Sequence, residues 1–164
     1  MSIFSGLEDI VDSNRSLRDY TWFGLGGTAD YVVTPRDVEQ LKTVARRCSE
    51  NDVPMYVLGF GSNLLIKDEG IRGAVIKLTR DEFEQMRFDG ERVTAGAGVN
   101  LNKLVLGCVR KGLAGLEALT GIPGSFGGAV KMNAGGNFGD IGASVESVTL
   151  MDGRGKVFEK RSRS

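Results

Sequence analysis

Clustered glycines constrain the fold of this chain more than any other feature of its sequence. The chain has 24 glycines among 164 residues, roughly twice the share of about 7 % that is usual in globular proteins. Many stand in three short segments, at residues 24–27, 59–61 and 121–128. Because glycine lets backbone N–H groups approach a ligand closely, such loops suit phosphate oxygens. We therefore expect an ordered protein whose binding chemistry lies largely in its backbone.

The remaining composition excludes several classes of chemistry. Acidic and basic side chains balance at 21 each, which gives no electrostatic case for binding nucleic acid or an anionic membrane. Histidine is absent, so Ser-His-Asp and Cys-His mechanisms and histidine-containing zinc sites are excluded. Cys48 and Cys108 are too far apart for a zinc ribbon or a CxxC pair, and both are expected in the core, so no metal site is predicted. Neither a membrane-spanning apolar run nor a signal peptide is recognisable, so a cytoplasmic protein is expected.

The apolar pattern predicts an α+β protein. Residues 1–20 are expected to form a short helix at Gly6–Val11 and a polar loop at Asp12–Ser16. Residues 21–79 predict a β-α-β-β unit with a parallel crossover, and residues 80–164 predict a second unit with two hairpins. The expected elements are strands at Tyr31–Val33, Met55–Leu58 (buried), Leu64–Ile66 and Ala74–Leu78, hairpins of Phe83–Phe88 with Val93–Ala95 and of Val145–Met151 with Lys156–Glu159, and helices that begin near Thr34, Asn100 and Gly127.

Two of the glycine segments are candidate anion sites. Residues 59–63 follow an expected strand and add the hydroxyl of Ser62 and the amide of Asn63, which fits a pyrophosphate cradle or a tight turn. In residues 121–129, Pro123 fixes one dihedral, and the small residues after it are expected to leave amides free at the start of a helix. A helix N-terminus favours an anion, although close packing of a helix on a sheet requires the same glycines.

The third segment does not carry the dinucleotide fingerprint that it formally matches. Gly24–Ala29 reads G-x-G-x-x-A, but this fingerprint must follow a strand and open a helix. Here the glycines precede the strand at Tyr31–Val33, and residues 59–64 fail because a strand is expected after them. A P-loop motif is absent as well. The residues alone therefore predict backbone anion sites suited to a dinucleotide or a nucleotide sugar, without naming a reaction.

The order of the motifs resembles that of one enzyme family. The motifs are Thr21–Gly27, Leu58–Leu65, Ala95–Gly98, Gly112–Glu117, Gly121–Ala129 and Met132–Gly135. This series resembles the UDP-N-acetylenolpyruvoylglucosamine reductases, or UDP-N-acetylmuramate dehydrogenases, over about residues 18–160. The resemblance implies a vanillyl-alcohol-oxidase (PCMH) type FAD-binding domain of two α+β subdomains, over 21–79 and 80–164. It also implies bacterial peptidoglycan synthesis in the cytoplasm, in which NADPH reduces the flavin and the hydride passes to an enolpyruvyl UDP-sugar.

The resemblance also implies which residues contact FAD. They are Gly59, Phe60, Gly61, Ser62, Asn63 and Leu64 in the first loop, Gly121, Ile122, Pro123, Gly124, Ser125, Gly127 and Gly128 in the second, and Asn133, Gly139 and Ile141 beyond it. Phe60 stands where the family more usually has glycine, so its side chain must point away from the phosphates. Since histidine is absent and both cysteines are expected in the core, FAD is predicted to bind non-covalently.

The family's catalytic residues have no counterpart here. They are a Tyr-Arg pair beyond the last hairpin, a serine proton donor in a substrate domain and a glutamate near the C-terminus, whereas this chain ends Arg161-Ser162-Arg163-Ser164. We assign no catalytic residue and expect a truncated, FAD-binding portion without turnover and without the substrate domain. The alternative is a non-catalytic nucleotide-binding or assembly module. An unpaired edge of the second subdomain is expected to favour self-association.

Overall fold

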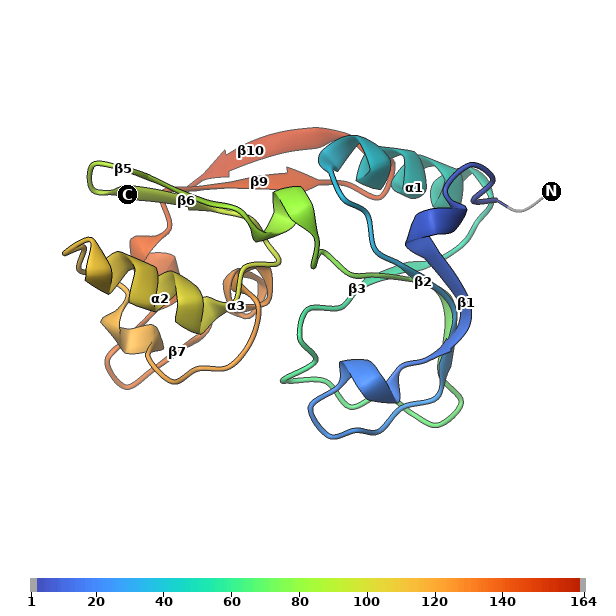
Figure 1. Ribbon diagram of the computed structural model, residues 1–164, viewed down its shortest axis with the longest axis horizontal. Helices are drawn as coiled ribbons and strands as arrows, with labels where there is room; N and C mark the ends of the chain where they lie inside the picture. Colours follow the sequence, from blue (N-terminus) through green and yellow to red (C-terminus); the bar gives the residue numbers. More distant parts are fainter. Residues whose placement is uncertain (1–2, 163–164) are drawn as a thin grey trace.

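Two neighbouring groups of elements make up the molecule, which Figure 1 shows with its longest axis horizontal. The structure is a computed structural model that describes residues 3–162. In the first group, β2 (Thr28–Val33) and β4 (Ile71–Ile76) form the centre of a four-stranded sheet of order β1-β2-β4-β3. β1 (Val11–Ser16) pairs antiparallel with β2, and β3 (Met55–Val57) pairs parallel with β4.

Helix α1 (Val38–Glu50) makes the crossover between the parallel strands β2 and β3. Its apolar residues recur at helical spacing, and Val44, Ala45 and Cys48 are buried against the sheet. The four residues at the end of β4, from Gly73 to Ile76, are all buried, which is why that strand reads as a continuous apolar run. The predicted parallel β-α-β arrangement is therefore present in the structure.

The N-terminal part differs from its prediction. Asp12–Ser16, expected as a loop, belongs to strand β1, and its polar side chains are largely exposed because β1 is an edge strand with only β2 beside it. The helix expected at Gly6–Val11 is only a 3-10 turn, Glu8–Ile10. A second 3-10 turn, Arg18–Tyr20, follows β1. Residues 12–16 form a strand because their backbone pairs with β2, and the polar composition of the segment does not predict this pairing.

Three further predictions for the first group are wrong. Helix α1 is capped by Asp37, whose Oδ1 accepts a 2.7 Å hydrogen bond from the amide of Gln40, so Thr34 is not the cap. Strand β3 is at the edge of the sheet and largely exposed rather than buried. Residues 64–66 form no strand, because they continue the loop that begins at Gly59.

The second group contains two helices and three two-stranded sheets. Its cap prediction at Asn100 is confirmed, because the Oδ1 atom of that residue accepts from the amide of Lys103 at 3.1 Å. Its elements are 3-10 turn Asp81–Glu84, β5 (Met86–Asp89), β6 (Arg92–Ala95), α2 (Leu101–Arg110), 3-10 turn Glu117–Leu119, α3 (Phe126–Met132), β7 (Gly135–Gly136), β8 (Gly139–Asp140), 3-10 turn Ile141–Ser144, β9 (Ser147–Met151) and β10 (Val157–Arg161).

Each group has its own buried clusters. Those of the first group lie on the two sides of the sheet, around Val33 and around Val75. Those of the second surround α2, through Leu101 on one side and Leu104 on the other. The division of the chain into residues 21–79 and 80–164 stays a prediction.

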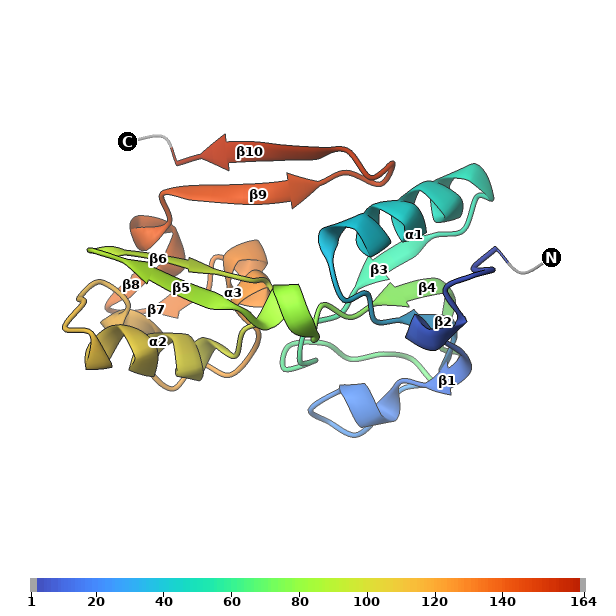
Figure 2. The ribbon, with the colours of Figure 1, turned by 45° about the horizontal axis from the view of Figure 1, so that its top comes forward.

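The β9–β10 hairpin joins the two groups, since it starts beside the second group and its turn reaches α1 (Figure 2). Gly155 in that turn lies against the backbone of Lys42 on α1. The tail residues Arg163 and Ser164 lie outside the described residues. No helix within residues 3–162 is both long enough and apolar enough to cross a bilayer.

Candidate functional site

Two glycine loops from different groups of elements meet in the structure. The first, residues 59–64, follows β3 and Leu58, and the second, residues 121–125, leads into α3. Gly59 packs against the hydroxyl of Ser125 so closely that a Cβ atom at Gly59 would clash with that oxygen. A Cβ atom at Gly124 would in turn lie 3.9 Å from the hydroxyl oxygen of Ser62. The two sequence motifs therefore form one neighbourhood.

Two carbonyl groups of the first loop are held from the protein side. The ammonium of Lys77 donates to the carbonyl oxygen of Gly59 at 2.9 Å, and the amide of Trp22 donates to the carbonyl oxygen of Gly61 at 3.1 Å. The peptide bonds are trans, and in a trans peptide the N–H points opposite to the preceding C=O. The N–H groups of Phe60 and Ser62 therefore point away from these two anchors.

The amides of this loop have no acceptor within the protein. Among residues 3–162, none of the backbone N–H groups of residues 59–64 donates to a protein atom. The hydroxyl oxygen of Ser62 is buried and likewise has no hydrogen-bond partner in that part of the chain. Since buried polar groups are almost always hydrogen-bonded, the Ser62 hydroxyl indicates a ligand, and the free amides beside it fit one rich in acceptor oxygens.

The start of α3 does not offer the free amides that the sequence predicted. The amide of Phe126 donates to the carbonyl of Val99 at 2.7 Å, that of Gly127 to Ala97 at 2.8 Å, and that of Gly128 to the Ser125 hydroxyl at 3.3 Å. A Cβ atom at Gly127 would also clash with Ala97. Gly127 is thus required for close packing, which was the alternative interpretation of this segment.

The rest of the second loop leaves a smaller set of donors. The amides of Gly121, Gly124 and Ser125 donate to no protein acceptor within residues 3–162. Ile122 is tied back by a 3.1 Å bond from its amide to Leu119 and packs against the neighbouring core, whereas Pro123 has no N–H group and is exposed. The free donors of this segment therefore come before α3.

The last three predicted contacts lie beyond the C-terminal end of α3. Asn133 adopts a left-handed backbone conformation there, and its Oδ1 atom accepts from the amide of Gly142 at 3.1 Å. Ile141 is buried in the core around α2, whereas Gly139 is exposed. Asn133 and Ile141 line a hollow together with residues 160–162 at the end of β10 and just after it. Their contact with FAD stays a prediction.

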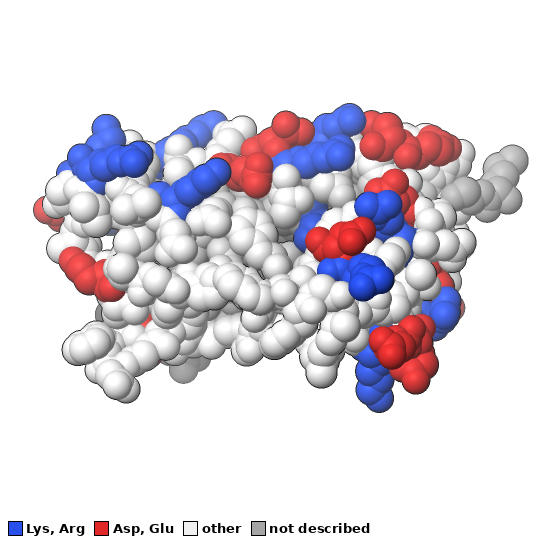
Figure 3. Space-filling model, turned by 60° about the horizontal axis from the view of Figure 1, so that its bottom comes forward, with Lys and Arg blue, Asp and Glu red and all other residues white. Residues whose placement is uncertain are grey.

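Charged side chains are unevenly distributed over the surface. Figure 3 shows a face whose central part carries few of them, while acidic and basic groups gather along its upper edge and on one side. Trp22, Leu64 and Leu65, next to the first loop or within it, are exposed apolar residues. Lys77, in contrast, is buried beneath that loop, with 8 % of its surface exposed.

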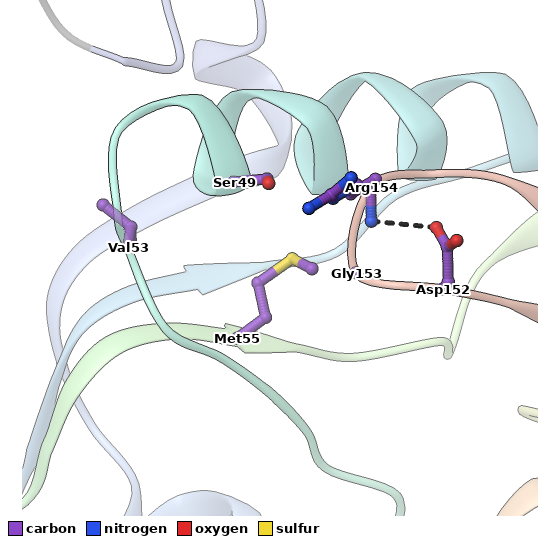
Figure 4. Close-up of a pocket in the computed structure, with 6 residues that line it drawn as sticks. All are labelled: Ser49, Val53, Met55, Asp152, Gly153 and Arg154. Atoms are coloured by element: carbon purple, nitrogen blue, oxygen red, sulfur yellow. Dashed lines mark hydrogen bonds between the residues drawn. The ribbon is translucent and has the colours of Figure 1, made fainter.

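A larger hollow elsewhere in the molecule lacks catalytic chemistry. It lies between the end of α1, β3 and the β9–β10 turn, and Figure 4 shows its six lining residues. The carboxylate of Asp152 at its rim already accepts from the amides of Arg154 and Lys156, both at 2.9 Å. Among residues 3–162 no group of three or more Cys, Asp or Glu side chains could hold a metal ion.

Sequence reasoning missed the two anchors of the first loop. Lys77 is the one charged residue in the run Ala74–Leu78, and a lysine in an otherwise apolar strand is the signal that could have singled it out. Trp22 was noted only as part of a motif, since a bond made by its backbone leaves no trace in the sequence.

Comparison with known proteins decides the family. Residues 29–160 match the family model of the FAD binding domain. The chain belongs to this FAD-binding family. It is 43 % identical over 156 residues to the UDP-N-acetylenolpyruvoylglucosamine reductase of Clostridium botulinum and 40 % identical over 158 residues to that of Clostridium novyi. These alignments cover 92 % and 93 % of this chain but 50 % and 51 % of the relatives, so the chain spans about half their length.

Solved structures agree with the family and confirm the predicted fold. The crystal structure of the reductase MurB from Thermus caldophilus superposes with a TM-score of 0.77 at 40 % identity, over 90 % of this chain and 51 % of that one. The 6-hydroxy-D-nicotine oxidase of Arthrobacter nicotinovorans shares the fold, with a TM-score of 0.71 at 21 % identity. Its superposition covers 92 % of this chain and 35 % of that one. The predicted resemblance to the FAD-binding portion of these reductases is confirmed.

Proposed function

We propose that this chain binds FAD non-covalently and that residues 59–64 hold the pyrophosphate group. The observation that carries the proposal is a row of backbone amides that have no acceptor within residues 3–162. They lie beside the hydroxyl of Ser62, which has no partner in the same range. Phosphate oxygens are strong acceptors and suit such a loop. The family membership supports the same cofactor.

The residues of the chain have distinct parts in this proposal. The outward N–H groups of Phe60 and Ser62 donate to the ligand, and the hydroxyl of Ser62 adds a third donor. Gly59 and Ser125 hold the two loops together, so that the donors of residues 121–125 reach the same ligand. Bound FAD supplies hydride transfer, whereas these residues bind and orient it.

The proposed setting is a longer oxidoreductase like the named relatives. There NADPH would be the reductant and an enolpyruvyl UDP-sugar the substrate, in cytoplasmic peptidoglycan synthesis. We propose that the present chain alone binds FAD without turnover, because the tyrosine-arginine pair of the family has no counterpart in its sequence.

Spectroscopy on the purified chain tests both parts of the proposal. FAD should quench the fluorescence of Trp22, the single tryptophan, with saturable binding, and acid precipitation should release all of the flavin. ADP should compete, since it carries the same pyrophosphate. A chain that takes up neither FAD nor ADP contradicts the binding proposal. Oxidation of NADPH that depends on the enolpyruvyl UDP-sugar contradicts the inactivity proposal.

Self-association is proposed through strand β10. This strand pairs only with β9, and all five of its residues are exposed, which leaves one row of N–H and C=O groups without a neighbouring strand within the described residues. Sedimentation over a range of protein concentrations tests the proposal. A monomer at every concentration contradicts it.

A further inference from the structure

Lys77 reaches the first loop, residues 59–64, from the interior of the protein. It directly follows β4, and its amide donates to the carbonyl of Val33 at 2.8 Å, which continues the pairing of β4 with β2. Its side chain is buried and extends to the carbonyl oxygen of Gly59, 2.9 Å from Nζ. The ring of Tyr20 packs against the same ammonium, with its centroid 4.8 Å from Nζ.

The ammonium of Lys77 has no anionic partner in the part of the chain that the structure describes. No carboxylate among residues 3–162 lies within ion-pair distance of it, and burial lowers its pKa without any opposing acidic group. Buried charges in proteins are normally paired, because removing an ion from water is costly. One neutral carbonyl and one aromatic ring stabilise a buried charge less well than water does. This cation would therefore be stabilised by an anion that binds near it.

The position of this cation relative to the loop indicates where its counter-ion belongs. Nζ contacts the inner side of the Gly59–Phe60 peptide, and the N–H of Phe60 points from the outer side of the same peptide. An anion bound by that N–H would therefore be separated from the ammonium by the thickness of one peptide group. The intervening peptide dipole is aligned with both charges, since its oxygen faces the cation and its N–H faces the anion.

We propose that Lys77 is a positioning residue for the pyrophosphate of FAD. Its ammonium fixes the Gly59–Phe60 peptide so that the N–H of Phe60 faces outward, and its charge attracts the pyrophosphate across that peptide. This inference rests on the proposed function and deepens it, because it assigns the positive charge of the site to a residue that the ligand does not touch.

A matched set of variants tests the proposal by ligand titration with Trp22 fluorescence and flavin absorbance. Lys77→Met keeps the length and apolar stem but removes the charge, and Lys77→Arg keeps the charge. Lys156→Met makes the same chemical change at an exposed position in the β9–β10 turn. Affinities for FAD, ADP and adenosine are compared, since adenosine has no phosphate.

Lys77→Met should weaken FAD and ADP binding by about 10- to 100-fold, as for loss of an interaction with a charged group, and leave adenosine binding within about twofold. Lys77→Arg should recover most of the affinity for FAD, and Lys156→Met should bind like the parent chain. Weakening of all three ligands alike by Lys77→Met, or equal losses in Lys77→Arg and Lys77→Met, would overturn the inference. A loss confined to FAD and ADP would place the effect at the pyrophosphate loop, whereas a general loss of structure would weaken adenosine binding as well.

Two measurements keep the inference separate from folding and from the proposed function. Circular dichroism checks each variant, and where Lys77→Met does not fold, Lys77→Gln takes its place with the same expected loss, since it carries no charge. If the parent chain binds neither FAD nor ADP, the proposed function and the inference both fail. If the parent chain binds FAD and Lys77→Met binds it equally well, the inference alone fails.

Discussion

The hydroxyl oxygen of Ser125 occupies the place where a side chain on Gly59 would begin. The two residues are 66 positions apart in the sequence, and each belongs to a different group of elements. Ser125 also caps α3 through its bond to the amide of Gly128. One contact therefore links the start of that helix to the loop that follows β3, and it requires glycine at position 59 because of space rather than backbone conformation.

Replacing Gly59 with alanine should separate the two loops. The added Cβ atom would clash with the Ser125 hydroxyl, and we expect the affinity for FAD to fall at least about tenfold. The free energy of unfolding should fall by roughly 1–3 kcal/mol, as for overpacking elsewhere in proteins. Titration of Trp22 fluorescence and chemical denaturation measure the two effects.

Two further variants control this experiment. In Gly153→Ala the added Cβ atom meets nothing within 4 Å, so both quantities should be unchanged. Ser125→Ala removes the oxygen that Gly59→Ala would meet, and the double variant should therefore recover part of the lost affinity. Equal affinity in Gly59→Ala and the parent chain would show that the contact does not position the loops.

Ser62→Ala should lower ligand affinity without lowering stability. The buried hydroxyl has no protein partner among the described residues, so its removal should not lower the free energy of unfolding, because a buried polar group without a partner carries a desolvation penalty. Losing one hydrogen bond to the charged pyrophosphate should weaken FAD binding by about 10- to 100-fold. Calorimetric titration and thermal unfolding measure both.

Ser144→Ala provides the opposite case. Its hydroxyl donates to the carbonyl of Gly115 at 2.6 Å, so this variant should lose stability and retain FAD affinity. A Ser62→Ala chain that is clearly less stable than its parent, or that binds FAD equally well, would contradict the assignment of this hydroxyl to the ligand.

Local patterns were enough to predict some elements, since their causes lie within a few residues. Helix α2 follows from its apolar face, the Asn100 cap and Gly112, whose φ of 70° is the left-handed conformation that ends helices. Strand β1 was missed because its pairing with β2 is not local. Strand β3 was expected to be buried, but Val57 is 69 % exposed because the sheet ends there.

The candidate site was predicted only as far as its motifs. Residues 59–64 stand out by composition, but the sequence cannot show that Lys77 and Trp22 turn two of their carbonyls inward. It suggested free amides at the start of α3, whereas the fold brings the carbonyls of Ala97 and Val99 to those amides. Contacts between distant segments thus decide which donors remain for a ligand.

Asp152 should titrate below its ordinary range. Hydrogen bonds from the amides of Lys156 and Arg154 hold the pKa of its carboxyl below the ordinary value of 3.8. Because the folded pKa is lower than the unfolded one, its contribution to the β9–β10 turn is complete above pH 3.8 and is lost as the pH falls through the folded pKa. Carboxyl NMR should give a midpoint below 3.8, and Asp152→Asn should abolish the accompanying shifts of the Arg154 and Lys156 amides. A midpoint at or above 3.8 would contradict these bonds.

Cys48 should be unreactive in the folded chain. Its side chain is buried between α1 and the sheet, and burial raises the pKa of its thiol to about 11, so almost no thiolate exists at pH 8. In a Cys108→Ala chain, a thiol reagent should label Cys48 only after denaturant is added. Because the folded pKa lies above the unfolded value of 9.0, the thiol contributes stability below pH 9 that is lost as the pH rises toward 11. Rapid labelling of the folded chain at pH 8 would show that this part of the core opens readily.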